Sequence, residues 1–138
     1  LSEVWVLYHT YGCVTSSGGS YNGTNLDKIY NPLGYKVTSC QLSDLKNNPA
    51  LKKRFDDALR AGIPQGFRTT YGADYATTQV NNNSHYLCVD KVSDDGTQYM
   101  VAQSARIKNG AQERWYTLDY LIKYGYNKNP NCWIVERQ

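Results

Sequence analysis

A cysteine and a histidine, far apart in the chain, are the residues whose types and surroundings could do chemistry. Cys13 follows the turn-forming pair Tyr11-Gly12, and His85 opens an apolar, β-branched run. A thiolate is a strong nucleophile, but a thiol with its ordinary pKa of about 8.5 is mostly protonated at neutral pH and needs a base. A histidine where a loop enters a core strand is held by the strand and can still reach a cleft. The pair predicts a nucleophile and its base, although His85 by itself also fits an ordinary strand-end residue.

The run from Asn83 to Val92 alternates as a β-strand does. One set of side chains is His85, Leu87 and Val89, and the other is Tyr86, Cys88 and Asp90. The turn residues 93–96 and a second strand over 98–103 predict a hairpin after it. This hairpin would hold His85 in place.

The rest of the chain shows further helix and strand patterns. Pro49 opens the clearest helix, 49–61, in which Lys52, Lys53, Asp56, Asp57 and Arg60 are expected to face water. Other expected helices are 24–30 and the segment from Thr117 to Tyr124. Expected strands are 4–8, 35–40 (an edge strand), 65–70, 114–116 and 132–135. Trp5, Trp115 and Trp133 are expected to pack in the core. The order predicts an α+β fold with N-terminal helices packed on a mainly antiparallel sheet.

Composition narrows the classes of protein. The chain has 138 residues, 41% hydrophobic and 20% charged, which favours one folded domain over 1–138, with 1–10 as a leading strand or a linker. No apolar run approaches the roughly 20 residues of a membrane helix, so no membrane insertion is expected. The net charge of +3 is mild and gives no argument for nucleic acid.

The four cysteines could form two disulfides in any of three pairings, or could be separate thiols, one of them reactive. They and the two histidines show no spacing typical of a metal site, and no cofactor is expected.

Several short motifs occur in order along the chain: Gly12-Cys13-Val14-Thr15-Ser16, Asn25-Leu26-Asp27-Lys28, Gly34-Tyr35, Ala61-Gly62-Ile63-Pro64, His85-Tyr86-Leu87-Cys88-Val89-Asp90 and Trp115-Tyr116-Thr117. In this set the chain resembles the C39-like branch of the papain-like cysteine peptidases. The resemblance covers roughly Tyr11 to Tyr124 and implies a papain-like fold, with Cys13 as nucleophile and His85 as base.

The resemblance also implies neighbours for the pair. The family places an Asp or Asn at the end of the strand after the hairpin, where this chain has Gln103, whose amide oxygen can accept the imidazole N–H. Tyr11, Gly12 and Tyr86 are the implied substrate contacts. Leu7 stands where the family carries a Gln that helps form the oxyanion hole, and losing such a donor typically costs about 10²–10³ in rate.

Two functions follow. The first is hydrolysis of peptide bonds through a thioester at Cys13. Peptidoglycan is a natural substrate if the domain belongs to an extracellular or virion-associated protein, because a mildly basic, tyrosine-rich surface suits an anionic envelope and sugar contacts. The second is an inactive papain-like module that binds peptide or glycan, or is a structural domain of a larger polypeptide or assembly. Tyr71, Tyr75 and Tyr86 would then be contact residues, and a disulfide at Cys13 would remove the nucleophile.

Overall fold

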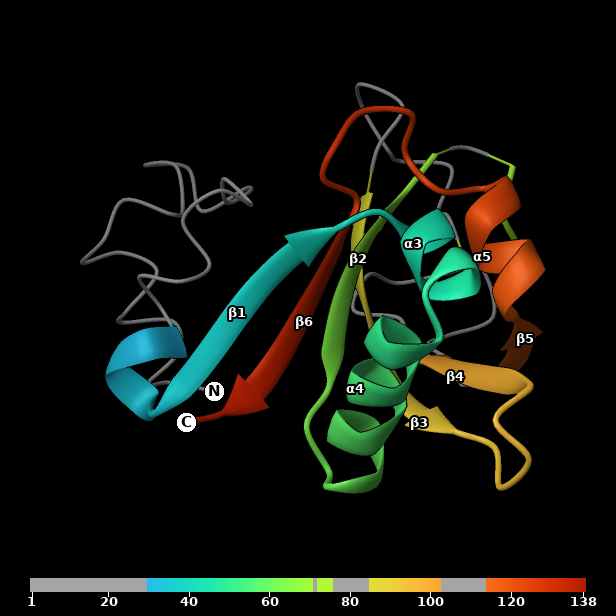
Figure 1. The fold of residues 1–138 in the computed structure, drawn as a ribbon. Helices are drawn as coiled ribbons and strands as arrows, with labels where there is room; N and C mark the ends of the chain where they lie inside the picture. Colours follow the sequence, from blue (N-terminus) through green and yellow to red (C-terminus); the bar gives the residue numbers. More distant parts are fainter. Residues whose placement is uncertain (1–29, 71, 76–84, 103–113) are drawn as a thin grey trace. The chain divides into compact units, whose positions relative to one another are not determined.

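The computed structural model describes residues 30–70, 72–75, 85–102 and 114–138 (Figure 1). Its elements in chain order are η2 (Asn31–Leu33), β1 (Tyr35–Cys40), α3 (Leu42–Asn47), α4 (Pro49–Arg60), β2 (Gln65–Thr69), β3 (His85–Val92), β4 (Gln98–Ala102), β5 (Arg114–Thr117), α5 (Leu118–Lys123) and β6 (Cys132–Arg137). The predicted α+β class is confirmed. The expected strand 4–8 and nearly all of the expected helix 24–30 lie outside the described residues.

The six strands form one antiparallel sheet in the order β1-β6-β2-β3-β4-β5. The last strand of the chain therefore lies between β1 and β2, and β1 is an edge strand as expected. The chain divides into two compact units: a first unit of residues 1–37 and 136–138, and a second unit of residues 38–135. The description of a single domain stays a prediction.

In the first unit, the described residues form a turn and the ends of two strands. The 3-10 helix η2 ends at Gly34, which has a φ of 89°, a backbone conformation that glycine adopts without strain. Gln138 donates its backbone N–H to the Gly34 carbonyl over 3.0 Å. The rings of Tyr30 and Tyr35 meet edge to face, with centroids 6.4 Å apart.

In the second unit, the helices α3, α4 and α5 lie on one face of the sheet (Figure 1). The sheet residues beneath them are apolar and buried, among them Phe67, Leu87 and Val89. On the other face of β3, Tyr86 is half-buried and Cys88 is exposed. The predicted alternation is confirmed for Tyr86 to Val89, and the face covered by helices is the one that holds Leu87 and Val89.

The register between β3 and β4 shifts between Val89 and Lys91, so that Asp90 is an extra residue on β3. Such a bulge moves every later side chain to the other face of the sheet. Val92 therefore lies opposite the buried Tyr99, while Lys91, Met100 and Trp115 form a row across three strands on the face away from the helices. The sequence pattern alone did not indicate this shift.

Helix α4 begins where predicted, because the Asn48 side chain accepts the backbone N–H of Leu51 and Pro49 needs no hydrogen-bond partner for its nitrogen. The expectation that Asp56 faces water is wrong, since Asp56 is buried. Its two carboxylate oxygens accept from the Tyr99 hydroxyl and from Lys52 Nζ, each over 2.6 Å. Lys52 also donates to the Gly96 carbonyl over 2.9 Å, so it is half-buried rather than free in water.

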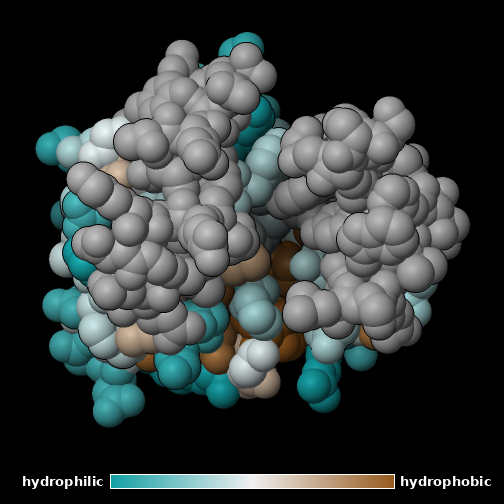
Figure 2. Space-filling view, turned by 180° about the vertical axis from the view of Figure 1, so that it is seen from behind, coloured by the Kyte–Doolittle hydropathy of each residue, from teal (hydrophilic) through white to brown (hydrophobic). Residues whose placement is uncertain are grey.

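The two described tryptophans differ in burial. Trp133 is buried as expected, and its ring packs on that of Tyr86 with centroids 5.6 Å apart. The expectation for Trp115 is wrong, because it lies on the edge strand β5 and is 44% exposed. Seen from behind, the coloured part of the surface shows apolar residues near its centre and hydrophilic residues at the left and lower edges (Figure 2). Trp5 lies outside the described residues.

Candidate functional site

His85 is the first residue of β3, next to the middle of the sheet, and its backbone pairs with that of Thr69 on β2. It occupies the same alternating set of positions as Leu87 and Val89. The prediction that a core strand holds the backbone of His85 at the strand's beginning is confirmed. Its side chain lies outside what the structure describes.

The strand end beside His85 is fixed by hydrogen bonds to the segment after α5. The carbonyl of Tyr124 accepts the backbone N–H of Thr70 and the hydroxyl of Thr69, each over 2.8 Å. Tyr126 donates its backbone N–H to the Arg68 carbonyl over 2.9 Å. Thr69 is fully buried, so the residue opposite His85 belongs to the core.

Aromatic rings fill the core near this end. Tyr75 is buried and lies against the rings of Phe67, Tyr116 and Tyr120, with centroids 5.1 to 5.8 Å apart. Burial is the main cause that raises the pKa of Tyr75 well above its ordinary value. Tyr75 therefore stays protonated, and its ring packs in the hydrophobic core.

Four of the predicted site residues lie outside the described residues: Tyr11, Gly12, Cys13 and Gln103. Gln103 follows Ala102, the last residue of β4, and Ala102 pairs with Cys88 of β3. The roles of these four residues stay predictions.

Tyr86 belongs to the face of the sheet away from the helices. The Arg68 guanidinium lies 4.9 Å from the centroid of its ring and 3.9 Å from that of Tyr126. A guanidinium between two rings gains cation–π attraction on both sides. Adjacent residues of a strand point to opposite faces, so Tyr86 and the position of His85 belong to different faces of β3. The role of Tyr86 as a substrate contact stays a prediction.

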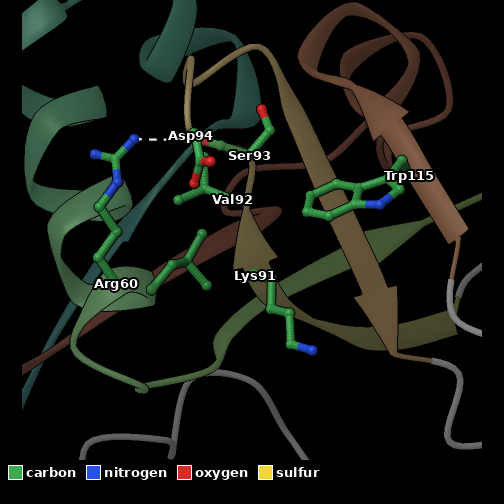
Figure 3. A pocket seen from close by; sticks show the side chains of 7 residues that line it. Arg60, Lys91, Val92, Ser93, Asp94 and Trp115 are labelled. Atoms are coloured by element: carbon green, nitrogen blue, oxygen red, sulfur yellow. Dashed lines mark hydrogen bonds between the residues drawn. The ribbon is translucent and has the colours of Figure 1, made fainter.

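A pocket of about 490 Å³ lies at the other end of β3 (Figure 3). It is lined by Leu59, Arg60, Lys91, Val92, Ser93, Asp94 and Trp115. Arg60 donates to the Ser93 carbonyl over 3.4 Å. Two cations, one carboxylate and an exposed indole suit contact with a polar, partly anionic molecule. Sequence reasoning missed this pocket, because Lys91 comes beside Trp115 only through the bulge at Asp90.

The pocket and the candidate base are separate sites. Lys91 follows His85 by six positions on one strand, which corresponds to roughly 20 Å at 3.3 Å per residue. A bound molecule the size of a monosaccharide could not touch both.

The three described cysteines are free thiols, of which Cys40 and Cys132 are buried and Cys88 is exposed. Within the described ranges, no three His, Cys, Asp or Glu side chains come together as metal ligands would. No helix of the described part of the chain has the length and hydropathy that crossing a membrane requires.

Comparison of the chain with protein-family models and with curated proteins gives no match.

Proposed function

We propose that the chain is a papain-like cysteine peptidase domain that hydrolyses amide bonds in peptides. The observation that carries the proposal is the position of His85 at the start of β3, with the hairpin partner β4 ending directly before Gln103. A base at the start of one strand and an orienting group just after its antiparallel neighbour can lie within hydrogen-bond reach, because the hairpin brings these two ends together.

In the proposed reaction, His85 takes up and gives back a proton in each of the two half-reactions. The imidazole takes the proton of the Cys13 thiol, and the thiolate attacks the carbonyl carbon of the scissile amide. The tetrahedral intermediate collapses to a thioester while His85 gives the proton to the leaving amine. A water molecule, deprotonated by His85, then attacks the thioester, and His85 returns that proton to the departing Cys13 sulfur, which releases the acid and the free thiol. Gln103 acts by holding the imidazole in one tautomer.

The proposed substrates are the peptides of bacterial cell walls, and the proposed setting is extracellular or virion-associated. The net charge of +3 favours approach to an anionic envelope. The thirteen tyrosines offer flat, amphipathic rings for contacts with sugars and peptides.

The test is the rate at which iodoacetamide labels Cys13 across a range of pH, read by mass spectrometry. An activated thiolate–imidazole pair predicts fast labelling well below pH 8 and a slowing of at least about tenfold in His85→Ala. His9→Ala is the matched control, since it removes the only other histidine, and the exposed thiol of Cys88 is an internal reference. If Cys13 is labelled no faster than Cys88, or is isolated in a disulfide, the peptidase proposal is wrong.

A second candidate function is binding of peptide or glycan without cleavage, and the pocket at Trp115 favours it. The test is co-sedimentation with purified peptidoglycan, together with an assay for newly released amino groups. A binding module predicts that Trp115→Ala abolishes sedimentation while the wild type releases no amines. A peptidase predicts amine release that Cys13→Ala abolishes.

A further inference from the structure

Cys40 and Cys132 occupy neighbouring strand ends in the second unit. Cys40 is the last residue of β1 and Cys132 is the first of β6, and these strands are adjacent in the sheet. The backbone N–H of Asn131 donates to the Cys40 carbonyl over 3.2 Å, which fixes the two chain segments against each other. Residues facing each other on antiparallel strands have Cα atoms about 4.5 to 5.5 Å apart, and disulfides span about 4.4 to 6.8 Å.

The two side chains are in contact. A hydrogen bond between the thiols is the main cause that lowers the pKa of Cys40 and raises that of Cys132. Both thiols are buried in the hydrophobic core.

The other described cysteine cannot compete for either thiol. Cys132 pairs with Phe67 of β2 and belongs to the face covered by helices. Cys88 pairs with Gly66 and belongs to the opposite face. Cys88 is also two strands away from β6, or roughly 10 Å at the usual strand spacing. Both facts place its sulfur beyond the reach of a disulfide.

We propose that Cys40 and Cys132 form a disulfide that joins β1 to β6 when the protein meets a small-molecule disulfide such as oxidised glutathione. The Cys40 thiolate attacks one sulfur of the oxidant, which gives a mixed disulfide and releases one glutathione. The Cys132 thiolate then attacks the Cys40 sulfur and releases the second glutathione. Two protein thiols are oxidised, one oxidant molecule is reduced to two thiols, and the two protons pass to the released thiolates. Because both sulfurs are buried, the exchange occurs during folding or when the ends of β1 and β6 open locally.

This pairing bears on the candidate nucleophile. Once Cys40 and Cys132 are joined, the only cysteine left that could block Cys13 is Cys88. The bridge would also close a loop of about 90 residues, and a disulfide across a long loop restricts the unfolded chain strongly.

The test uses the full chain, refolded in a buffer of oxidised and reduced glutathione, trapped with an alkylating agent and digested without reduction. We expect one linked peptide that contains Cys40 and Cys132, and a melting temperature roughly 5 to 15 °C above that of the reduced chain. Cys88→Ser should keep the linked peptide, whereas Cys40→Ser should lose it.

The proposal is overturned if both cysteines are alkylated in the refolded, soluble chain, or if either is linked elsewhere. The wild-type digest decides this even if Cys40→Ser does not fold. Neither result depends on whether the domain has peptidase activity.

Discussion

The two ends of β3 are held by different kinds of interaction. At the hairpin end, charged side chains hold α4 to the sheet through Lys52, the buried Asp56 and the hydroxyl of Tyr99. At the end where His85 begins the strand, the hydrogen bonds that fix β2 come from hydroxyl and backbone groups of Thr69 and Thr70. The first end depends on a half-buried ion pair, whereas hydroxyl and backbone groups make the hydrogen bonds that fix the second.

This difference matters for a catalytic histidine. A general base changes its charge during the reaction, and a fixed charge nearby would favour one of its two protonation states. At the His85 end, the hydrogen bonds that fix β2 come from neutral groups, and the Arg68 guanidinium lies with Tyr86 on the other face of the sheet. Among the described residues, the Lys52–Asp56 pair lies at the end of β3 that is remote from the proposed chemistry.

The largest expected effect is that of Asp56→Ala. It leaves the half-buried Lys52 ammonium and the fully buried Tyr99 hydroxyl without their shared acceptor. We therefore expect the free energy of unfolding, measured by urea denaturation, to fall by about 3 kcal/mol. Asp57→Ala is the matched control, because the Lys53–Asp57 pair has the same spacing but is exposed to solvent. Its cost should be about 0.5 kcal/mol or less. Equal losses in the two variants would mean that the buried pair does not hold the hairpin end.

Tyr99→Phe should cost less, about 1 to 2 kcal/mol, because Asp56 keeps its bond to Lys52. The variant should also change the response to alkali. Burial and the bond to Asp56 raise the pKa of Tyr99 well above its ordinary value, so the folded state keeps the proton that the unfolded chain loses above about pH 10.

The contribution of Tyr99 to the free energy of unfolding of the wild type should therefore be constant below about pH 10. It should fall as the pH rises further. Tyr99→Phe removes its share of that fall. Tyr75→Phe, whose raised pKa has burial as its main cause, is the corresponding variant at the His85 end. If the free energy of unfolding of Tyr99→Phe falls above about pH 10 as steeply as that of the wild type, deprotonation of Tyr99 is not coupled to unfolding.

The smallest expected effect is at the His85 end. Thr69→Val keeps the shape of the side chain and removes a neutral hydroxyl that donates to the Tyr124 carbonyl and, over a longer distance, to that of Thr70. The Tyr124 carbonyl still accepts from the Thr70 backbone, so we expect a loss of about 1 kcal/mol. Thr70→Val is the control, because that hydroxyl is half-buried and makes a longer bond of 3.3 Å to the same carbonyl. A loss as large as that of Asp56→Ala would show that the two ends do not differ as described.

The sequence predicted most elements well where one local signal dominates. Alternation identified β3, Pro49 marked the start of α4, and Thr117 caps α5 through the backbone N–H of Tyr120. It missed α3, a helix of six residues that begins after Gln41. Glutamine is an uncommon helix cap, and here it is supported by a reciprocal bond from its backbone N–H to Asp44. Too few turns were present for an apolar periodicity to appear.

For the candidate site, the sequence alone indicated which residues could do chemistry: a cysteine after a turn-forming pair, a histidine at a strand start and the hairpin that follows it. These depend on residue type and on local patterns of two or three residues. The tertiary structure decided what those patterns could not. Burial of Asp56 depends on Tyr99, which is 43 residues away, and exposure of Trp115 depends on β5 being at an edge. The contact of Cys40 with Cys132 depends on the last strand pairing beside the first described one. Such contacts between distant segments leave no periodic signal in the sequence, because only packing of the whole sheet brings them together.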